Sequence, residues 1–139
     1  MSTTNQSGIA GFITQAAKGG GNAMSFPRLG DRIAGDVVDR ELIDDQHNPG
    51  NQILKITLAV ESATIDGEAL QIDHVSEQVV KALYVRGPGL REAIGKAVVS
   101  AGADSIEPGD RLTVEFTGEK STGRSRALKL FAAEFKAAQ

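Results

Sequence analysis

One helix-like segment stands among strand-like segments, and its position limits the fold more than any other feature of the chain. In residues 90–102, Leu90, Ile94 and Val98 recur at helical intervals. Most of the chain after residue 26 instead alternates apolar and polar residues with the two-residue period of a half-buried strand. We therefore expect a mainly β protein with a single helix.

Five segments have the strand pattern, and the helix lies between the third and the fourth. These segments are residues 31–44, 52–60, 79–86, 111–116 and 128–135. Gly35 interrupts the first and predicts a bulge or bend that lets one strand serve two sheets. The polar stretch 61–78 contains the turn signal Asp66-Gly67 and predicts a small excursion hairpin over 63–72.

This order is that of the OB-fold, a five-stranded, partly open Greek-key barrel. Such barrels bind oligomers on their second and third strands and through their 1-2 and 4-5 loops. We expect residues 26–136 to form this domain and 137–139 to be a short tail. The glycine-rich residues 1–25 predict a disordered arm, in which 8–18 have the spacing of a short amphipathic turn. A frayed tail without that role is the alternative.

Composition narrows the class of protein. No apolar run approaches a membrane span, no secretory signal is present and there is no cysteine, so we expect a cytoplasmic protein. His47 and His74 stand far apart in acidic loops, and the sequence predicts no metal site, no cofactor and no catalytic residues. On these grounds we expect a protein that is not an enzyme.

Charge is distributed unevenly along the chain, whose net charge is −3. Residues 29–80 hold three Lys/Arg against eleven Asp/Glu, whereas residues 81–139 hold ten against seven. Four cations and one acid occur between Thr117 and Leu130, in a loop of Gly, Ser and Thr. Because flexible cationic side chains can follow a phosphate backbone, this loop at the 4-5 position favours nucleic-acid binding. A solvated loop that keeps a strand edge soluble is the alternative.

Strand alternation adds a candidate stacking face to the basic loop. Tyr84 is expected outside the barrel, beside Arg86 and across from Lys55 or Thr57, although packing against the arm or another subunit is equally open. Phe131 is a second stacking candidate, with core or interface packing favoured for it. The complete set of predicted nucleic-acid contacts is Lys55, Tyr84, Arg86, Lys120, Arg124, Arg126, Lys129 and Phe131.

Several short motifs make residues 26–136 resemble the small single-stranded DNA-binding proteins encoded by bacteriophages of actinobacteria. The motifs are Gly30-Asp31, Ala82-Leu83-Tyr84-Val85-Arg86-Gly87, the helix 90–101 ending in Ala-Gly-Ala, Pro108-Gly109-Asp110-Arg111-Leu112 and Lys129-Leu130-Phe131. The resemblance implies an OB-fold that coats single-stranded DNA in replication and recombination, usually as a homo-oligomer, with replication or recombination proteins as further partners.

Two features depart from that family. The chain ends without the acidic tail through which bacterial homologues recruit partners, and it has few aromatic residues. Two other functions therefore stay open: an OB domain that serves structure or protein interaction, and a binder of oligosaccharides or small ligands.

Overall fold

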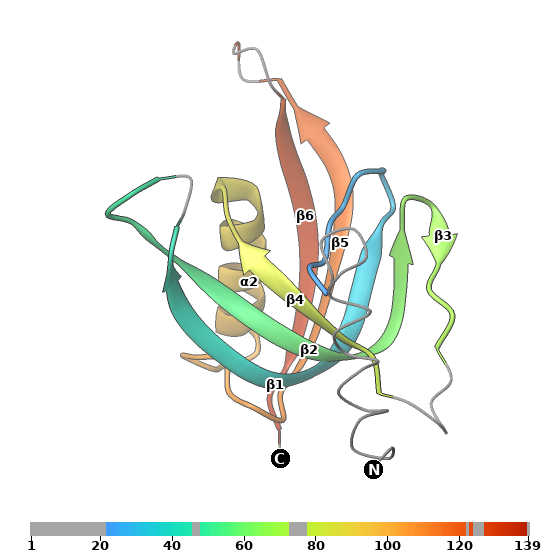
Figure 1. The fold of residues 1–139 in the computed structure, drawn as a ribbon. Coiled ribbons are helices and arrows are strands. Elements are labelled where there is room, and N and C mark those ends of the chain that lie inside the picture. Colours follow the sequence, from blue (N-terminus) through green and yellow to red (C-terminus); the bar gives the residue numbers. More distant parts are fainter. Residues whose placement is uncertain (1–21, 46–47, 73–77, 122, 124–126, 139) are drawn as a thin grey trace, which may run out of the picture.

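The computed structural model describes residues 22–45, 48–72, 78–121, 123 and 127–138. Within them the protein is mainly β, an antiparallel sheet of six strands with one helix (Figure 1). The elements are β1 (Arg32–Asp44), β2 (Gln52–Ile65), β3 (Glu68–Ala69), β4 (Val80–Val85), α2 (Pro88–Ser100), β5 (Arg111–Lys120) and β6 (Leu128–Lys136). No helix in these ranges is long and apolar enough to cross a membrane.

The strands follow the order β3-β2-β1-β5-β6, and β4 also pairs with β2. β2 divides one edge between two partners: residues 54–59 pair with β4, and residues 64–65 pair with β3. The sheet is not closed, because no pairing joins β4 to β6 within the described ranges. Helix α2, which follows β4 in the chain, packs against β6.

The prediction of five strands is wrong by one, and the extra strand comes from the excursion hairpin. Ile65 pairs with Glu68 across the two-residue turn Asp66-Gly67, where φ is 55° and 80°. Two successive positive φ angles are what a tight hairpin turn of type I′ requires, and they suit the strand twist. The turn signal therefore produces a short strand in addition to the five expected.

The long first strand bends as the sequence predicts. β1 pairs with β2 along its length but with β5 only over 32–36, and its register shifts between Ala34 and Gly35. A Cβ at Gly35 would collide with the carbonyl oxygen of Ala59. Glycine is needed here because β2 approaches the bend too closely for a side chain.

The core lies between the sheet and the helix. Its fully buried side chains include Ile33, Ile56, Leu58, Leu83 and Leu112, which occupy the inward faces that strand alternation predicts. The helix adds Leu90, Ile94 and Val98.

Two buried aspartates begin β1 and β5 with the same turn. Residues 30–32 and 109–111 are both Gly-Asp-Arg, and the two glycines have φ of 95° and 96°. In each turn the carboxylate accepts a hydrogen bond from the backbone N–H three residues earlier, at 2.9 Å for Asp31 and 2.7 Å for Asp110. This repeated motif fixes the starts of two neighbouring strands, and alternation alone did not reveal it.

Asp31 also joins the start of β1 to the β2–β3 turn. Its carboxylate accepts hydrogen bonds from the N–H groups of Asp66 and Gly67, both at 2.9 Å. Burial acts to raise the pKa of this carboxyl, but the backbone donors of Gly67, Arg28 and Asp66 outweigh it and lower the pKa below 3.8. The ionised form therefore stabilises the fold.

The N-terminal boundary of the folded part lies earlier than residue 26. Met24 donates its N–H to the carbonyl of Ala82 at 2.8 Å, and Ala82 donates to the carbonyl of Asn22 at 2.6 Å. Met24 and Phe26 are both buried. Residues 22–24 thus lie along β4, whereas the remainder of the expected arm, residues 1–21, lies outside the described residues.

Candidate nucleic-acid interface

A row of three side chains crosses the outer face of the sheet. Strand pairing places Glu41 of β1 opposite Lys55 of β2, and Lys55 opposite Tyr84 of β4. The Lys55 ammonium lies 3.6 Å from the Glu41 carboxylate and 5.9 Å from the centre of the Tyr84 ring. Of the two positions that alternation allowed opposite Tyr84, the structure selects Lys55.

Arg86 brings a second cation to the same ring. Its guanidinium carbon lies 5.5 Å from the centre of the Tyr84 ring. A cation within about 6 Å of an aromatic centroid is attracted by the negative face of the ring. Tyr84 is half-buried, and two cations lie against its ring.

Asp45, just after β1, holds Arg86. The Arg86 Nε atom lies 3.7 Å from a carboxylate oxygen of Asp45, whose side chain is only 7% exposed. Asn48 donates a side-chain hydrogen bond to the same carboxylate at 3.2 Å, and the N–H of Asp45 donates to the carbonyl of Asn51 at 2.9 Å. This arrangement ties the β1–β2 turn to the end of β4.

The β5–β6 hairpin extends beyond the rest of the sheet (Figure 1). Lys120 is exposed at the end of β5, opposite Leu128. The hydrogen bond and the charge of Lys96 lower the pKa of the Glu92 carboxyl on α2, and the charge of Lys120 makes a smaller contribution in the same direction. Lys120 therefore lies near α2. Arg124 and Arg126 lie outside the described residues.

Lys129, at the base of this hairpin, is engaged by the chain itself. Its ammonium donates a hydrogen bond to the carbonyl of Phe26 at 2.9 Å and lies 5.0 Å from the centre of the Phe116 ring. The structure therefore directs this cation toward the N-terminal segment, away from its predicted role as a phosphate contact.

Phe131 is partly buried and packs against the core, which is the alternative favoured for it over base stacking. Its ring centre lies 5.1 Å from that of Phe26 and 5.7 Å from that of Phe116. The first turn of α2 packs on the same part of β6, where a Cβ at Gly89 would collide with the carbonyl oxygen of Lys129. This contact with the helix covers the face of β6 that carries Phe131.

Of the six predicted contacts that lie in the described residues, the structure therefore brings together three, Lys55, Tyr84 and Arg86. The sequence analysis missed the carboxylates of Glu41 and Asp45 that accompany them. Within the described ranges no three His, Asp or Glu side chains converge as metal ligands would.

Comparison with known proteins gives one relative to report. No family model and no solved structure matches the chain. A UDP-N-acetylmuramoylalanine–D-glutamate ligase of Mycolicibacterium smegmatis is 28% identical over an alignment of 120 residues, and the match covers 80% of this chain. The match covers 24% of the ligase, so the chain spans about a quarter of that enzyme's length.

This similarity corrects one expectation. The sequence motifs alone indicated a protein that is not an enzyme, whereas the relative that matches most of the chain is named as a ligase. The resemblance to phage single-stranded DNA-binding proteins stays a prediction.

Proposed function

We propose that the chain binds single-stranded DNA on the outer face of β1, β2 and β4, with a base stacked on Tyr84. The observation that carries the proposal is the half-buried ring of Tyr84 with two cations within 6 Å of its centre, at 5.9 Å and 5.5 Å. Stacking on an aromatic side chain contributes about 1 to 3 kcal/mol per base and tolerates every base. Binding with little sequence preference follows.

Phosphates are the second part of the interaction. Lys55 and Arg86 have carboxylate partners at 3.6 Å and 3.7 Å in the free protein. A DNA phosphate near Tyr84 replaces Glu41 as the partner of Lys55, because an exposed ion pair contributes only about 0 to 1 kcal/mol. Release of counterions from the DNA then drives association and makes it sensitive to salt.

We propose further that the sheet is an OB-fold left open between β4 and β6. The pairings β4-β2-β1-β5-β6 follow the OB-fold strand order, with β3 as an added strand on the edge of β2. In this assignment β2 and β4 are the second and third strands of the barrel, which carry the binding face in OB-folds. In the order of strands, the loop with Arg124 and Arg126 falls at the 4-5 position, and in this proposal its cations add phosphate contacts.

The test is a fluorescence titration of a labelled poly-dT oligonucleotide over a series of salt concentrations. Binding that weakens as salt rises, and a slope that falls by about 0.7 in a Lys55→Ala variant, would support the proposal. Lys96→Ala is the matched control, because Lys96 is exposed on α2 and paired with Glu92 at 2.8 Å. The proposal fails if poly-dT is not bound, or if both variants behave alike.

Arg124→Ala together with Arg126→Ala tests the loop in the same assay. Loss of both cations should weaken binding and lower the slope by about 0.7 for each phosphate contact removed. An unchanged slope would restrict the interface to the face around Tyr84.

The ligase similarity supports a second candidate, an enzymatic role that involves UDP-N-acetylmuramoylalanine or D-glutamate, the compounds in the name of that relative. Isothermal titration calorimetry with UDP-N-acetylmuramoylalanine tests it directly. Saturable binding that a poly-dT oligonucleotide does not displace would favour this candidate, and absence of heat at millimolar ligand would reject it.

A further inference from the structure

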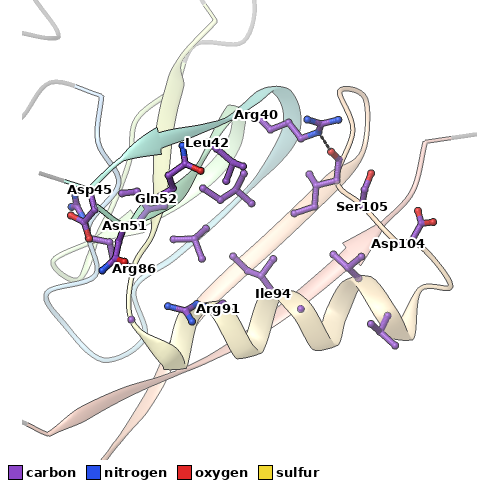
Figure 2. A pocket seen from close by; sticks show the side chains of 18 of the residues that line it. Arg40, Leu42, Asp45, Asn51, Gln52, Arg86, Arg91, Ile94, Asp104 and Ser105 are labelled. Atoms are coloured by element: carbon purple, nitrogen blue, oxygen red, sulfur yellow. Dashed lines mark hydrogen bonds and ion pairs between the residues drawn. The ribbon is translucent and has the colours of Figure 1, made fainter. Parts of the chain in front are cut away.

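A groove of about 1410 Å³ separates the tip of β1 and β2 from helix α2 (Figure 2). Its wall on the sheet side carries Leu42 and Leu54, which are register partners, and Ile94 and Val98 come from the helix. Leu42 is 65% exposed although it points into the groove. An exposed leucine above buried apolar residues marks a surface that a further apolar side chain can cover.

The strand that borders this groove has a free edge. Pairing of β1 with β5 ends at Asp36, and the last backbone contacts on that side join Val37 to Asp110 and Gly109, at 2.7 Å and 2.8 Å. From residue 38 to 44, the edge of β1 opposite β2 has no strand partner in the described part of the chain. The N–H of Arg40 donates to the Asp39 side chain at 2.8 Å. The rest of this backbone edge, beside an apolar groove, is suited to another extended polypeptide.

Charge at the two ends of the groove gives the occupant an orientation. Arg91, near the start of α2, lines one end of the groove and has no ion-pair partner among the described residues. Asp45, which also lines the groove, lies beside Arg86. At the other end of the groove, the Arg40 guanidinium donates a hydrogen bond to the carbonyl of Ile106 and lies 2.9 Å from the carboxylate of Glu107. The available cation is therefore Arg91, which favours a carboxylate on the occupant.

We propose that this groove binds an extended segment of a partner protein, which adds a strand to the free edge of β1. Apolar side chains at alternate positions would enter the groove beside Leu42, and an acidic residue would pair with Arg91. A segment of about six residues spans roughly 20 Å, which is comparable with the seven-residue edge.

The apolar part of the groove lies on the opposite side of the sheet from Tyr84, whereas Arg86 and Asp45, which accompany Tyr84, also line the groove. Leu42 and Leu54 face the groove, whereas their neighbours Glu41 and Lys55 face outward. Because successive side chains of a strand point to opposite faces, a partner in the groove leaves Tyr84 accessible. The proposal thus gives the chain a second binding surface, which shares Arg86 with the first.

Selection of random heptapeptides displayed on phage, with the whole protein as target, tests the proposal. Enriched peptides should alternate apolar residues and carry Asp or Glu. Fluorescence anisotropy of one enriched peptide should show about 30-fold weaker binding to Leu42→Asp, as for the loss of a central apolar anchor, and weaker binding to Arg91→Glu. Leu29→Asp is the control, because Leu29 is also 62% exposed but does not line the groove.

Hydrogen exchange shows whether the peptide forms a strand. Alternate amides between residues 38 and 44 should gain protection when the peptide is bound, and poly-dT binding by Leu42→Asp should be unchanged. No enrichment, enriched peptides that bind Leu42→Asp as tightly as the parent, or no gain in protection would overturn the proposal. A dimer of the free protein that Leu42→Asp dissociates would also overturn it, because the occupant would then be a second copy.

Discussion

Replacement of Tyr84 by alanine separates stacking from phosphate contact. The centre of the ring lies 5.9 Å from the Lys55 ammonium and 5.5 Å from the Arg86 guanidinium carbon, and the proposed function adds one stacked base at this position. Loss of one stacked base should cost about 1 to 3 kcal/mol, which corresponds to roughly 5- to 150-fold weaker binding of poly-dT. Tyr84→Phe keeps the ring and should bind within about twofold of the parent protein.

A salt series makes this prediction specific. Tyr84→Ala removes no charge, so the slope of log affinity against log salt should stay as it is, while Lys55→Ala lowers it by about 0.7. Thermal unfolding of each variant confirms that the half-buried position tolerates the change. The reasoning is refuted if Tyr84→Ala binds within twofold of the parent, or if Tyr84→Phe loses as much affinity as Tyr84→Ala.

Four further variants test the surroundings of the site and the fold. Glu41→Gln removes the carboxylate beside the lysine of the site and should tighten poly-dT binding up to about fivefold, whereas unchanged or weaker binding would show that the pair does not compete with DNA. Asp31→Asn should lower the free energy of unfolding by about 3 kcal/mol at pH 7 in urea titrations. Because the pKa of Asp31 is lowered in the fold, the stability that its carboxylate contributes is present above pH 3.8 and is lost as pH falls through the folded pKa. The difference in unfolding free energy between the parent and Asp31→Asn should therefore shrink in acid. A difference that stays constant with pH would contradict this. Gly89→Ala should destabilise by about 1 to 3 kcal/mol because its methyl meets a carbonyl oxygen of β6, while Gly95→Ala, at an open helical position, should stabilise slightly in the same titrations.

Alternation predicted the faces of β1, β2, β4 and β5 well because one face of each of these strands carries buried residues. It placed Tyr84 and Lys55 outside and Leu83 inside, as the structure has them. It did not determine which face of β6 is buried, since that strand has apolar residues on both faces. The decision comes from α2, which packs on the face of Phe131. This is a tertiary contact that no local pattern contains.

The carboxylate beside Lys55 was also beyond local patterns, because it depends on a bulge. Val37 pairs with Leu58, and at that register Arg40 would stand opposite Lys55. The shift between Val37 and Asp39 inserts one residue in β1 and brings Glu41 opposite Lys55 instead. A single inserted residue thus replaces a repelling neighbour by an attracting one.

The two ion pairs beside Tyr84 differ in how readily a phosphate can displace them. Glu41 is 51% exposed, so its pair with Lys55 is solvated and exchanges readily with a phosphate. Asp45 is 7% exposed and is held by Asn48, so it remains in place and keeps Arg86 at the ring. Breaking a buried pair costs more than breaking an exposed one because it leaves a desolvated charge. In the proposed complex Arg86 would therefore orient the stacking ring while Lys55 exchanges partners, which is how an acidic chain would present a local site for a polyanion.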